Sequence, residues 1–231
     1  MGVPFQQHTT VTAAGSKPLR TLAYRHGWIY ETVTALTSIP AGGPGRLRDL
    51  CAAALAERLP QGAAVLDLCC GGGAAAGSLL RRGFVVTALD CSAAALDRAA
   101  KRYPELIPVQ GLAENPPLAD QSFAGIQVSL ALHEFGPDAL DVLLRSARRL
   151  LRPGGWLVVL DLHPAPPLLK LGQDLFVGLF ETETATAFLR DDPIQRLTQA
   201  GFVVEEQQLE AGGALQRITA IRPLEASSAA E

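Results

Sequence analysis

The sequence has 231 residues, of which 48% are hydrophobic, and its mean hydropathy is +0.19. A chain of this length and composition can bury a large apolar core, so we expect one globular domain rather than disorder. Its formal net charge of −3 gives no overall attraction to nucleic acid or to an anionic membrane surface. No signal-peptide pattern and no membrane-spanning apolar tract is present, so we expect a cytoplasmic protein without an integral membrane segment.

The four cysteines do not have the spacing of a metal site. They are Cys51, Cys69, Cys70 and Cys91, and none forms a C-x-x-C pair. Adjacent Cys69 and Cys70 cannot readily supply two independent ligands to one metal ion. We therefore expect reduced, mostly buried thiols and no metal.

Strand-like and helix-like segments alternate through the first half of the chain. Residues 1–45 are predicted to form an N-terminal helical arm or cap, which ends in a cluster of glycine and proline. The elements predicted next are an amphipathic helix at 46–59, a buried strand at 64–68, a helix capped by Gly83, a strand at 84–90 and a helix from the N-cap Ser92 to Arg102.

The alternation continues to a terminal hairpin. The predicted elements are a strand at 123–132, a helix from Pro137 to the RPGG turn, a strand at 156–163, a helix between Asp192 and Gly201, and hairpin strands at 202–210 and 215–222. Repeated strand-helix-strand units predict an α/β fold with a doubly wound, mostly parallel sheet and an antiparallel last strand. We expect one domain over 46–224, followed by a flexible tail at 225–231.

The glycine-rich stretch VLDLCCGGG, residues 65–73, joins the first predicted strand to a helix. Open parallel sheets bind ligands at this carboxyl end of their strands. Gly71 and Gly73 let the backbone pass close to a ligand, near the amides that begin the helix. Asp90 ends the next strand about 20 residues on, where it can accept hydrogen bonds from ribose hydroxyls. The alternative is an ordinary tight turn and a solvated strand-end acid.

Two classes of enzyme are compatible with this loop. Gly71, Gly73 and Ala76 match the G-x-G-x-x-A dinucleotide fingerprint, which leaves a nicotinamide-dependent oxidoreductase open. Asp67 favours a different ligand, because a carboxylate just before the glycines opposes a pyrophosphate. The same carboxylate can orient a ligand that carries an ammonium group and a sulfonium cation.

At these residues the sequence resembles the class I S-adenosylmethionine-dependent methyltransferases, in the branch of the ubiquinone and menaquinone C-methyltransferases. VLDLCCGGG with its double cysteine, Asp90, and LLRPGGWLVVLD at 150–161 carry the resemblance, which covers about 46–222. It implies a Rossmann-like sheet of seven strands and S-adenosylmethionine as cofactor. The implied cofactor residues are Asp67, Leu68, Cys69, Gly71, Gly73, Asp90, Cys91, Leu112, Ala113, Glu114 and Ser129. Among them, the Cys69 and Gly71 backbones would face the methionine part, Asp90 the ribose and Cys91 the adenine.

The sequence departs from that family pattern at two places. In VQGLAENPPLADQSF, residues 109–123, the family usually has an acid before the alanine, where this chain has Leu112. Either Glu114 replaces that acceptor for the adenine amino group, or apolar contacts and the Ala113 backbone hold the adenine, at a cost of about 1 kcal/mol in discrimination. LALHEFGPD, residues 130–138, replaces the usual segment after the fourth strand.

Methyl transfer depends mainly on alignment of the acceptor and exclusion of water. For an acceptor that must lose a proton, such as a phenol or a hydroquinone carbon, His133 is the candidate base, with Glu134 beside it. A helix-capping or packing histidine is the alternative. His163 after the fifth strand is a second candidate, and Asp161 is expected to support the strand end.

The segments that would contact the acceptor are less informative. Tyr24, His26, Trp28 and Tyr30 either wall the pocket or pack in the core. Residues 164–188, rich in leucine and phenylalanine, either line an entrance for an apolar acceptor or form a dimer interface. Glu181 and Glu183 within them are expected to be solvated or capping residues.

The sequence therefore predicts a methyltransferase whose partner is a small, apolar or aromatic acceptor such as a quinol. Two alternatives stay open at this point. One is the nicotinamide-dependent oxidoreductase, and the other is a non-catalytic module that keeps the cofactor pocket.

Overall fold

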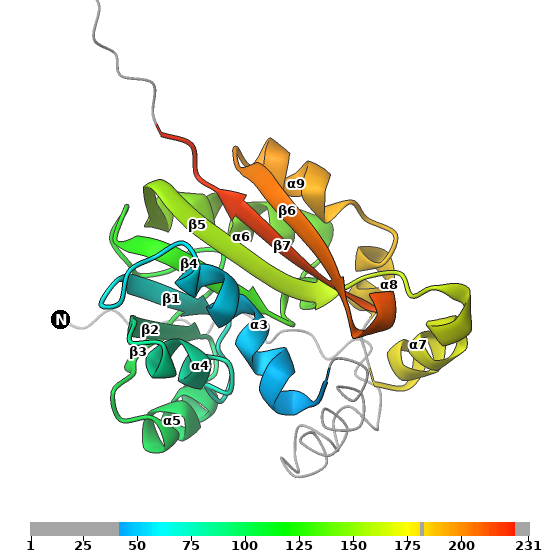
Figure 1. Cartoon of the computed structure of the whole chain (residues 1–231), viewed down its shortest axis with the longest axis horizontal. Coiled ribbons are helices and arrows are strands. Elements are labelled where there is room, and N and C mark those ends of the chain that lie inside the picture. Colours follow the sequence, from blue (N-terminus) through cyan, green and yellow to red (C-terminus); the bar gives the residue numbers. More distant parts are fainter. Residues whose placement is uncertain (1–41, 181–182, 225–231) are drawn as a thin grey trace, which may run out of the picture.

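Seven strands form one sheet in this computed structural model, which describes residues 42–180 and 183–224 (Figure 1). The strands are β1 (Ala64–Leu68), β2 (Val85–Asp90), β3 (Ile107–Gln110), β4 (Phe123–Ser129), β5 (Leu151–Leu162), β6 (Val203–Glu210) and β7 (Leu215–Ile221). Their order in the sheet is β3-β2-β1-β4-β5-β7-β6. Strands β1 to β5 pair in parallel, and β7 is antiparallel to both β5 and β6. The predicted sheet with an antiparallel last strand is confirmed.

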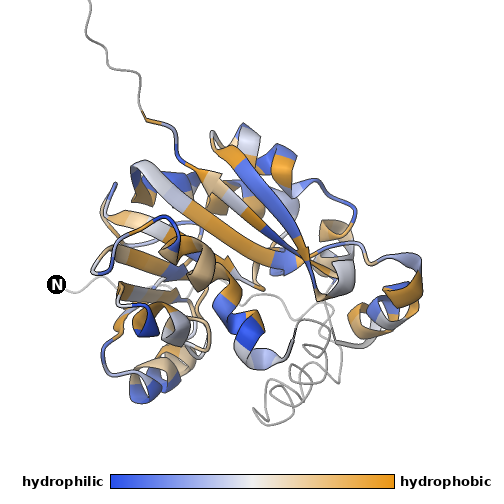
Figure 2. Cartoon of the chain, in the orientation of Figure 1, coloured by the Kyte–Doolittle hydropathy of each residue, from blue (hydrophilic) through white to orange (hydrophobic). Residues whose placement is uncertain are grey.

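Helices cover both faces of this sheet. They are α3 (Pro44–Ala56), α4 (Ala76–Arg81), α5 (Ala93–Arg102), α6 (Pro137–Leu150), α7 (Pro167–Phe180), α8 (Glu183–Phe188) and α9 (Pro193–Gln199), with 3₁₀ turns η2 (Leu132–Glu134) and η3 (Ala211–Gly213). Side chains of α3, α4 and α5 share one buried cluster with the sheet, and those of α6, α8 and α9 share another. Figure 2 shows the hydrophobic residues concentrated on the central strands, whereas the edge strand β6 is largely hydrophilic.

Local capping explains several helix boundaries. The Ser92 Oγ accepts a hydrogen bond from the Ala95 amide at 3.3 Å, so α5 begins where its N-cap predicts. The Asp192 carboxylate likewise accepts from the amides of Ile194 and Gln195 at the start of α9. Gly83 has a φ of +80°, as a residue after a helix commonly does.

Two predicted strand boundaries were wrong. The strand predicted to begin at residue 156 begins at Leu151, because Arg222, which follows β7, holds the intervening turn. Its Nη1 donates to the carbonyl oxygens of Leu151 at 2.7 Å and Arg148 at 3.0 Å. The strand predicted to reach residue 132 ends at Ser129, because Leu130 has a φ of +55° and turns the chain into η2.

Sequence periodicity did not reveal the short strand β3 or the two helices α7 and α8. Helix α7 lies beyond the carboxyl end of β5 (Figure 1) and exposes Leu168, Leu171 and Leu175. No helix in the described part of the chain is both long enough and apolar enough to cross a membrane. Most of the predicted arm (1–41) and the predicted tail (225–231) lie outside the described residues, as do the aromatic residues predicted near the acceptor and Glu181.

Candidate functional site

The predicted cofactor residues meet at one edge of the sheet. Asp67 is paired in register with Ala88 of β2 and Gln127 of β4, and Asp90 with Gln110 of β3. Because these strands are parallel neighbours, the loops after them share one edge. The Leu68 side chain is fully buried in the core, so only its backbone can contact a ligand, whereas Ser129 is half-buried at the end of β4.

The Asp90 carboxylate holds the glycine loop. Its Oδ2 accepts a hydrogen bond from the Gly71 amide at 2.8 Å, and its Oδ1 accepts from the Ser92 amide at 2.9 Å. Each oxygen keeps a further lone pair for a ligand hydroxyl. A methyl group added at Gly71 would meet no described atom within 4 Å, so the space beside this residue is open. At Gly73 the added methyl would lie 2.9 Å from the Ala99 Cβ, so that glycine allows the loop to pack on α5.

Cys69 completes an unusual loop backbone. Its φ of +64° lies in the left-handed region that side chains with a Cβ disfavour. The free energy cost of such a conformation is about 1 kcal/mol or more. Residues held in this way occur preferentially at functional sites.

Asp67 is a buried carboxylate with an unsatisfied oxygen. The Gln127 Nε2 donates to its Oδ1 at 2.9 Å, and both side chains are at most 1% exposed. Neither Asp67 Oδ2 nor Gln127 Oε1 has a hydrogen-bond partner within the described chain. Burial raises the pKa of the Asp67 carboxyl to about 7 and the nearby Asp90 charge adds to this increase, whereas the Gln127 side chain and the Ala76 backbone amide act in the opposite direction. Two buried acceptors without a donor favour a ligand that supplies N–H groups.

Gln127 was not predicted as a site residue. Its only sequence signal is an amide inside the otherwise apolar strand stretch IQV, at 126–128. A buried polar side chain in a strand needs a partner, but the sequence does not identify Asp67, which is 60 residues away.

The predicted adenine side lies beside the end of β2. Leu112 is 60% exposed, and Ala113 is buried. Burial raises the pKa of the Cys69 and Cys91 thiols, and the Asp90 and Glu114 charges contribute to both increases. The Glu114 carboxylate therefore lies close enough to both cysteines to affect them electrostatically. Cys91 is exposed, Cys69 is half-buried and the other two cysteines are buried, all four as free thiols.

His133 is held by Asp161 of β5. The His133 Nδ1 lies 2.6 Å from the Asp161 Oδ1, and the two side chains are nearly or fully buried. Asp161 also accepts hydrogen bonds from the backbone amides of Ala131, Leu132 and Leu162, so its predicted support of the strand end is confirmed. His163 instead contacts the Gly213 carbonyl oxygen at 2.9 Å, next to η3, which makes it part of the β6–β7 turn.

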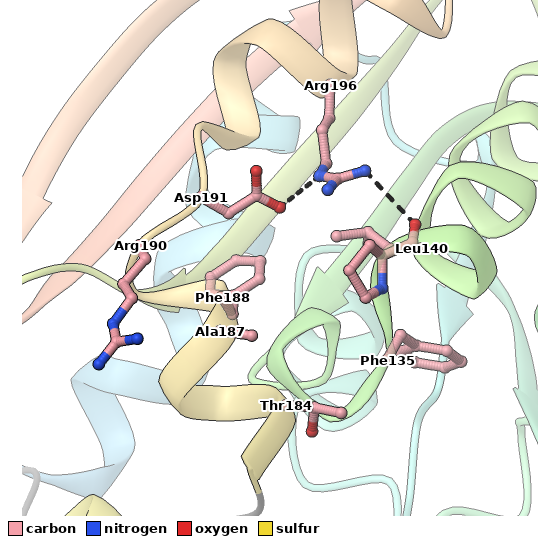
Figure 3. A pocket seen from close by; sticks show the side chains of 9 residues that line it. Phe135, Leu140, Thr184, Ala187, Phe188, Arg190, Asp191 and Arg196 are labelled. Atoms are coloured by element: carbon pink, nitrogen blue, oxygen red, sulfur yellow. Dashed lines mark hydrogen bonds and ion pairs between the residues drawn. The ribbon is translucent and has the colours of Figure 1, made fainter.

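A pocket of about 210 Å³ lies on the flank of η2, apart from the glycine loop (Figure 3). Its lining residues come from the stretch after β4, from α6 and from the α8–α9 segment: Phe135, Pro137, Leu140, Thr184, Ala187, Phe188, Arg190, Asp191 and Arg196. None of them is a predicted cofactor residue. Figure 3 shows Phe188 on one side of the pocket and Leu140 and Phe135 on the other. No local sequence signal marks this pocket, because its residues come from three separate segments.

Comparison with known proteins identifies the family. The model of a family described as a methyltransferase domain matches residues 65–155. A methyltransferase of Synechocystis sp., described as uncharacterized, is 42% identical over 202 residues, which cover 87% of this chain and 94% of the relative. The chain belongs to the methyltransferase family. This confirms the predicted S-adenosylmethionine-dependent methyltransferase and decides against the oxidoreductase.

Two further similarities extend the comparison. The 2-phytyl-1,4-naphtoquinone methyltransferase of Thermosynechococcus vestitus is 39% identical over 137 residues, which cover 55% of this chain and 59% of the relative. The solved structure of a Burkholderia thailandensis 1,6-didemethyltoxoflavin-N1-methyltransferase superposes with a TM-score of 0.62 at 22% identity, over 89% of this chain and 87% of that chain. The superposition shows that this chain and the B. thailandensis enzyme have the same fold.

Proposed function

We propose that this methyltransferase transfers the methyl group of S-adenosylmethionine to a small apolar or aromatic acceptor, with a quinol ring as the leading class. The observation that carries the proposal is the pair of carboxylates beside an open glycine loop. Asp67 is buried with one unsatisfied oxygen, and Asp90 anchors Gly71. These residues fit the charge and hydroxyl pattern of S-adenosylmethionine.

Each part of the cofactor has a matching group in the chain. Asp67 would accept a hydrogen bond from the ammonium group of its methionine part through its unsatisfied oxygen, and Gln127 would hold that carboxylate in place. Asp90 would accept from the ribose hydroxyls, and the open space beside Gly71 leaves room for the ligand. When bound, the cofactor supplies an electrophilic methyl group on a sulfonium.

Glu114 is the proposed acceptor for the adenine amino group. Its charge contributes to the raised pKa of the Cys69 and Cys91 thiols, which supports a carboxylate on the same side of the sheet as these residues. Leu112, at the position of the usual acid, is largely exposed and would offer the adenine an apolar contact. This combination would restore the polar contact that Leu112 cannot make.

The acceptor is proposed to bind between η2 and the α7–α8 segment. Supporting this, α7 exposes three leucines, Leu168, Leu171 and Leu175, beyond the carboxyl end of β5. The T. vestitus relative is named for a naphthoquinone that carries a phytyl chain, which is an apolar aromatic molecule. His133 would take the proton that such an acceptor loses, and the bound acceptor would itself exclude water from the methyl group.

Calorimetry and a turnover assay together test the proposal. The protein should bind S-adenosylhomocysteine and not NADH, and Asp90→Ala should weaken that binding by about 10-fold or more while the fold is retained. Incubation with S-adenosylmethionine and reduced naphthoquinones should give a product heavier by one CH₂ in mass spectrometry. Failure to bind S-adenosylhomocysteine would contradict the donor site. Binding without turnover of any acceptor in a metabolite extract would instead favour the non-catalytic module.

A further inference from the structure

We propose that Asp161 is a positioning residue that holds His133 with Nδ1 protonated, so that Nε2 is its proton-accepting nitrogen. The catalytic consequence rests on the proposed role of His133 as a base. The protonation pattern itself rests only on the contacts of the two side chains.

The hydrogen bonds around Asp161 determine which atom donates. Its Oδ2 accepts from the Ala131 amide at 3.1 Å and the Leu132 amide at 2.7 Å, and its Oδ1 accepts from the Leu162 amide at 2.7 Å. Backbone amides can only donate, so both carboxylate oxygens act as acceptors. The fourth contact, to the His133 Nδ1 at 2.6 Å, must therefore place the hydrogen on the histidine nitrogen.

The same carboxylate fixes the turn that carries the ring. Leu130 has a φ of +55°, a conformation that costs about 1 kcal/mol or more for a residue with a side chain. Its amide donates to the Leu160 carbonyl oxygen at 2.7 Å, and the next two amides donate to Asp161. These contacts to β5 offset the backbone strain and hold η2 against the end of that strand. Ring and turn are thus positioned by one side chain.

A neutral imidazole has one donor nitrogen and one acceptor nitrogen. With the Nδ1 hydrogen committed to Asp161, a proton that leaves the acceptor can only be taken up at Nε2. The electron pair of the broken O–H or C–H bond stays on the acceptor, and the Nδ1 hydrogen does not move. The Glu134 Oε1 lies 3.9 Å from Nε2, so the imidazolium formed would lie between two carboxylates.

Nitrogen NMR of the full-length protein labelled with ¹⁵N-histidine tests this assignment without any acceptor. The nitrogen signals that are missing from the spectrum of His133→Gln are those of the His133 ring. At neutral pH we expect a protonated Nδ1 and an unprotonated Nε2 in His133. His163 provides an internal reference, because its Nδ1 faces a carbonyl oxygen that can only accept. A protonated Nε2 in the wild-type protein, as the other tautomer or as an imidazolium, would overturn the proposal.

Substitution of Asp161 provides the second readout. In Asp161→Asn the carbonyl oxygen can still accept from the Ala131 and Leu132 amides. The NH₂ group loses the hydrogen bond from the Leu162 amide but can donate to Nδ1, so the hydrogen should move to Nε2. An unchanged tautomer in this variant would also overturn the proposal. Gln216→Met is the matched control, because Gln216 donates to the Leu162 carbonyl oxygen at 2.9 Å, at the same strand end. It should change thermal stability without changing the His133 tautomer. If Asp161→Asn does not fold, the wild-type spectrum still decides the assignment.

Kinetics then separate positioning from a merely structural role. Once an acceptor is found, Asp161→Asn should lower kcat by about 100-fold and change KM by no more than about threefold. S-adenosylhomocysteine affinity should stay within about threefold of wild type, because Asp161 does not contact the glycine loop residues. If wild-type protein fails to bind S-adenosylhomocysteine, the proposed function fails while the NMR result on Asp161 stands.

Discussion

At the scale of one residue, Asp67 is a buried carboxylate whose ionisation lowers the stability of the folded chain. Its carboxyl is fully buried with one unsatisfied oxygen, and burial raises its pKa from 3.8 to about 7. The folded protein therefore favours the protonated form more than the unfolded chain does. The stabilisation by that proton is complete below about pH 4 and is lost as the pH rises through 7.

Replacement of Asp67 by asparagine should therefore stabilise the ligand-free protein. At pH 8 we expect the free energy of unfolding of Asp67→Asn to rise by about 1–3 kcal/mol, because a buried charge with an unsatisfied oxygen is removed. The asparagine oxygen can still accept from the Gln127 amide. Urea denaturation at pH 4 and pH 8 measures the effect, which should nearly vanish at pH 4. A lower stability of the variant at pH 8 would show that the carboxylate is well paired.

The ionisation of Asp67 should also affect cofactor binding, but there the ionised form is the favoured one. Asp67 must be ionised to accept from an ammonium group, so S-adenosylhomocysteine affinity should rise between pH 5.5 and 7 and level off above it. The slope should approach about tenfold per pH unit below the pKa of about 7. Calorimetry across this range measures it, with Asp67→Asn as the control that should bind weakly and without this slope. A flat wild-type profile would contradict direct contact between Asp67 and the ammonium group.

At the scale of elements, the glycine loop combines two different requirements. Gly73 has a φ of +74° and leaves room for Ala99 of α5, whereas Gly72 has an ordinary backbone and open space around its Cα among the described atoms. Neighbouring glycines in the same run are therefore under different constraints. One serves the packing of the loop on a helix, and the other does not.

Alanine substitution should separate these two glycines. Gly73→Ala should lower the free energy of unfolding by about 1–3 kcal/mol, because the new methyl group lies too close to Ala99 and the backbone is strained. Gly72→Ala, the matched control, should change it by less than about 0.5 kcal/mol. Thermal unfolding of both variants measures the difference. Equal stabilities would mean that the loop relaxes away from α5 without cost.

At the scale of the whole molecule, Arg222 ties the end of the chain's last strand to the middle of the sequence. It is buried at 5% exposure, and its guanidinium caps the junction of α6 and β5 more than 70 residues earlier in the chain. The contact closes the sheet around β5, the strand that also carries Asp161. The antiparallel strand thus supports the site although it contributes none of the predicted cofactor residues.

Removal of this contact should weaken the whole fold. Arg222→Met should lower the free energy of unfolding by about 2–4 kcal/mol, because two buried carbonyl oxygens lose their charged donor. Arg98→Met on the exposed face of α5 is the control and should change it by less than about 0.5 kcal/mol. Denaturant unfolding measures both. A change in Arg222→Met as small as in the control would show that the junction is held by strand pairing alone.

The sequence by itself determined the alternation of strands and helices apart from β3, α7 and α8, together with the glycine loop and the acids Asp67 and Asp90. These follow from local periodicity, caps and the rule that parallel strands expose their carboxyl ends at one edge. Only the tertiary structure decided that Gln127 meets Asp67, that Asp161 meets His133, and that α7 and α8 lie beyond β5. Such contacts depend on strand register and on the packing of segments that are distant in the sequence. Leu130 is the clearest case, because its unfavourable backbone is stable only where β5 offers acceptors for the turn.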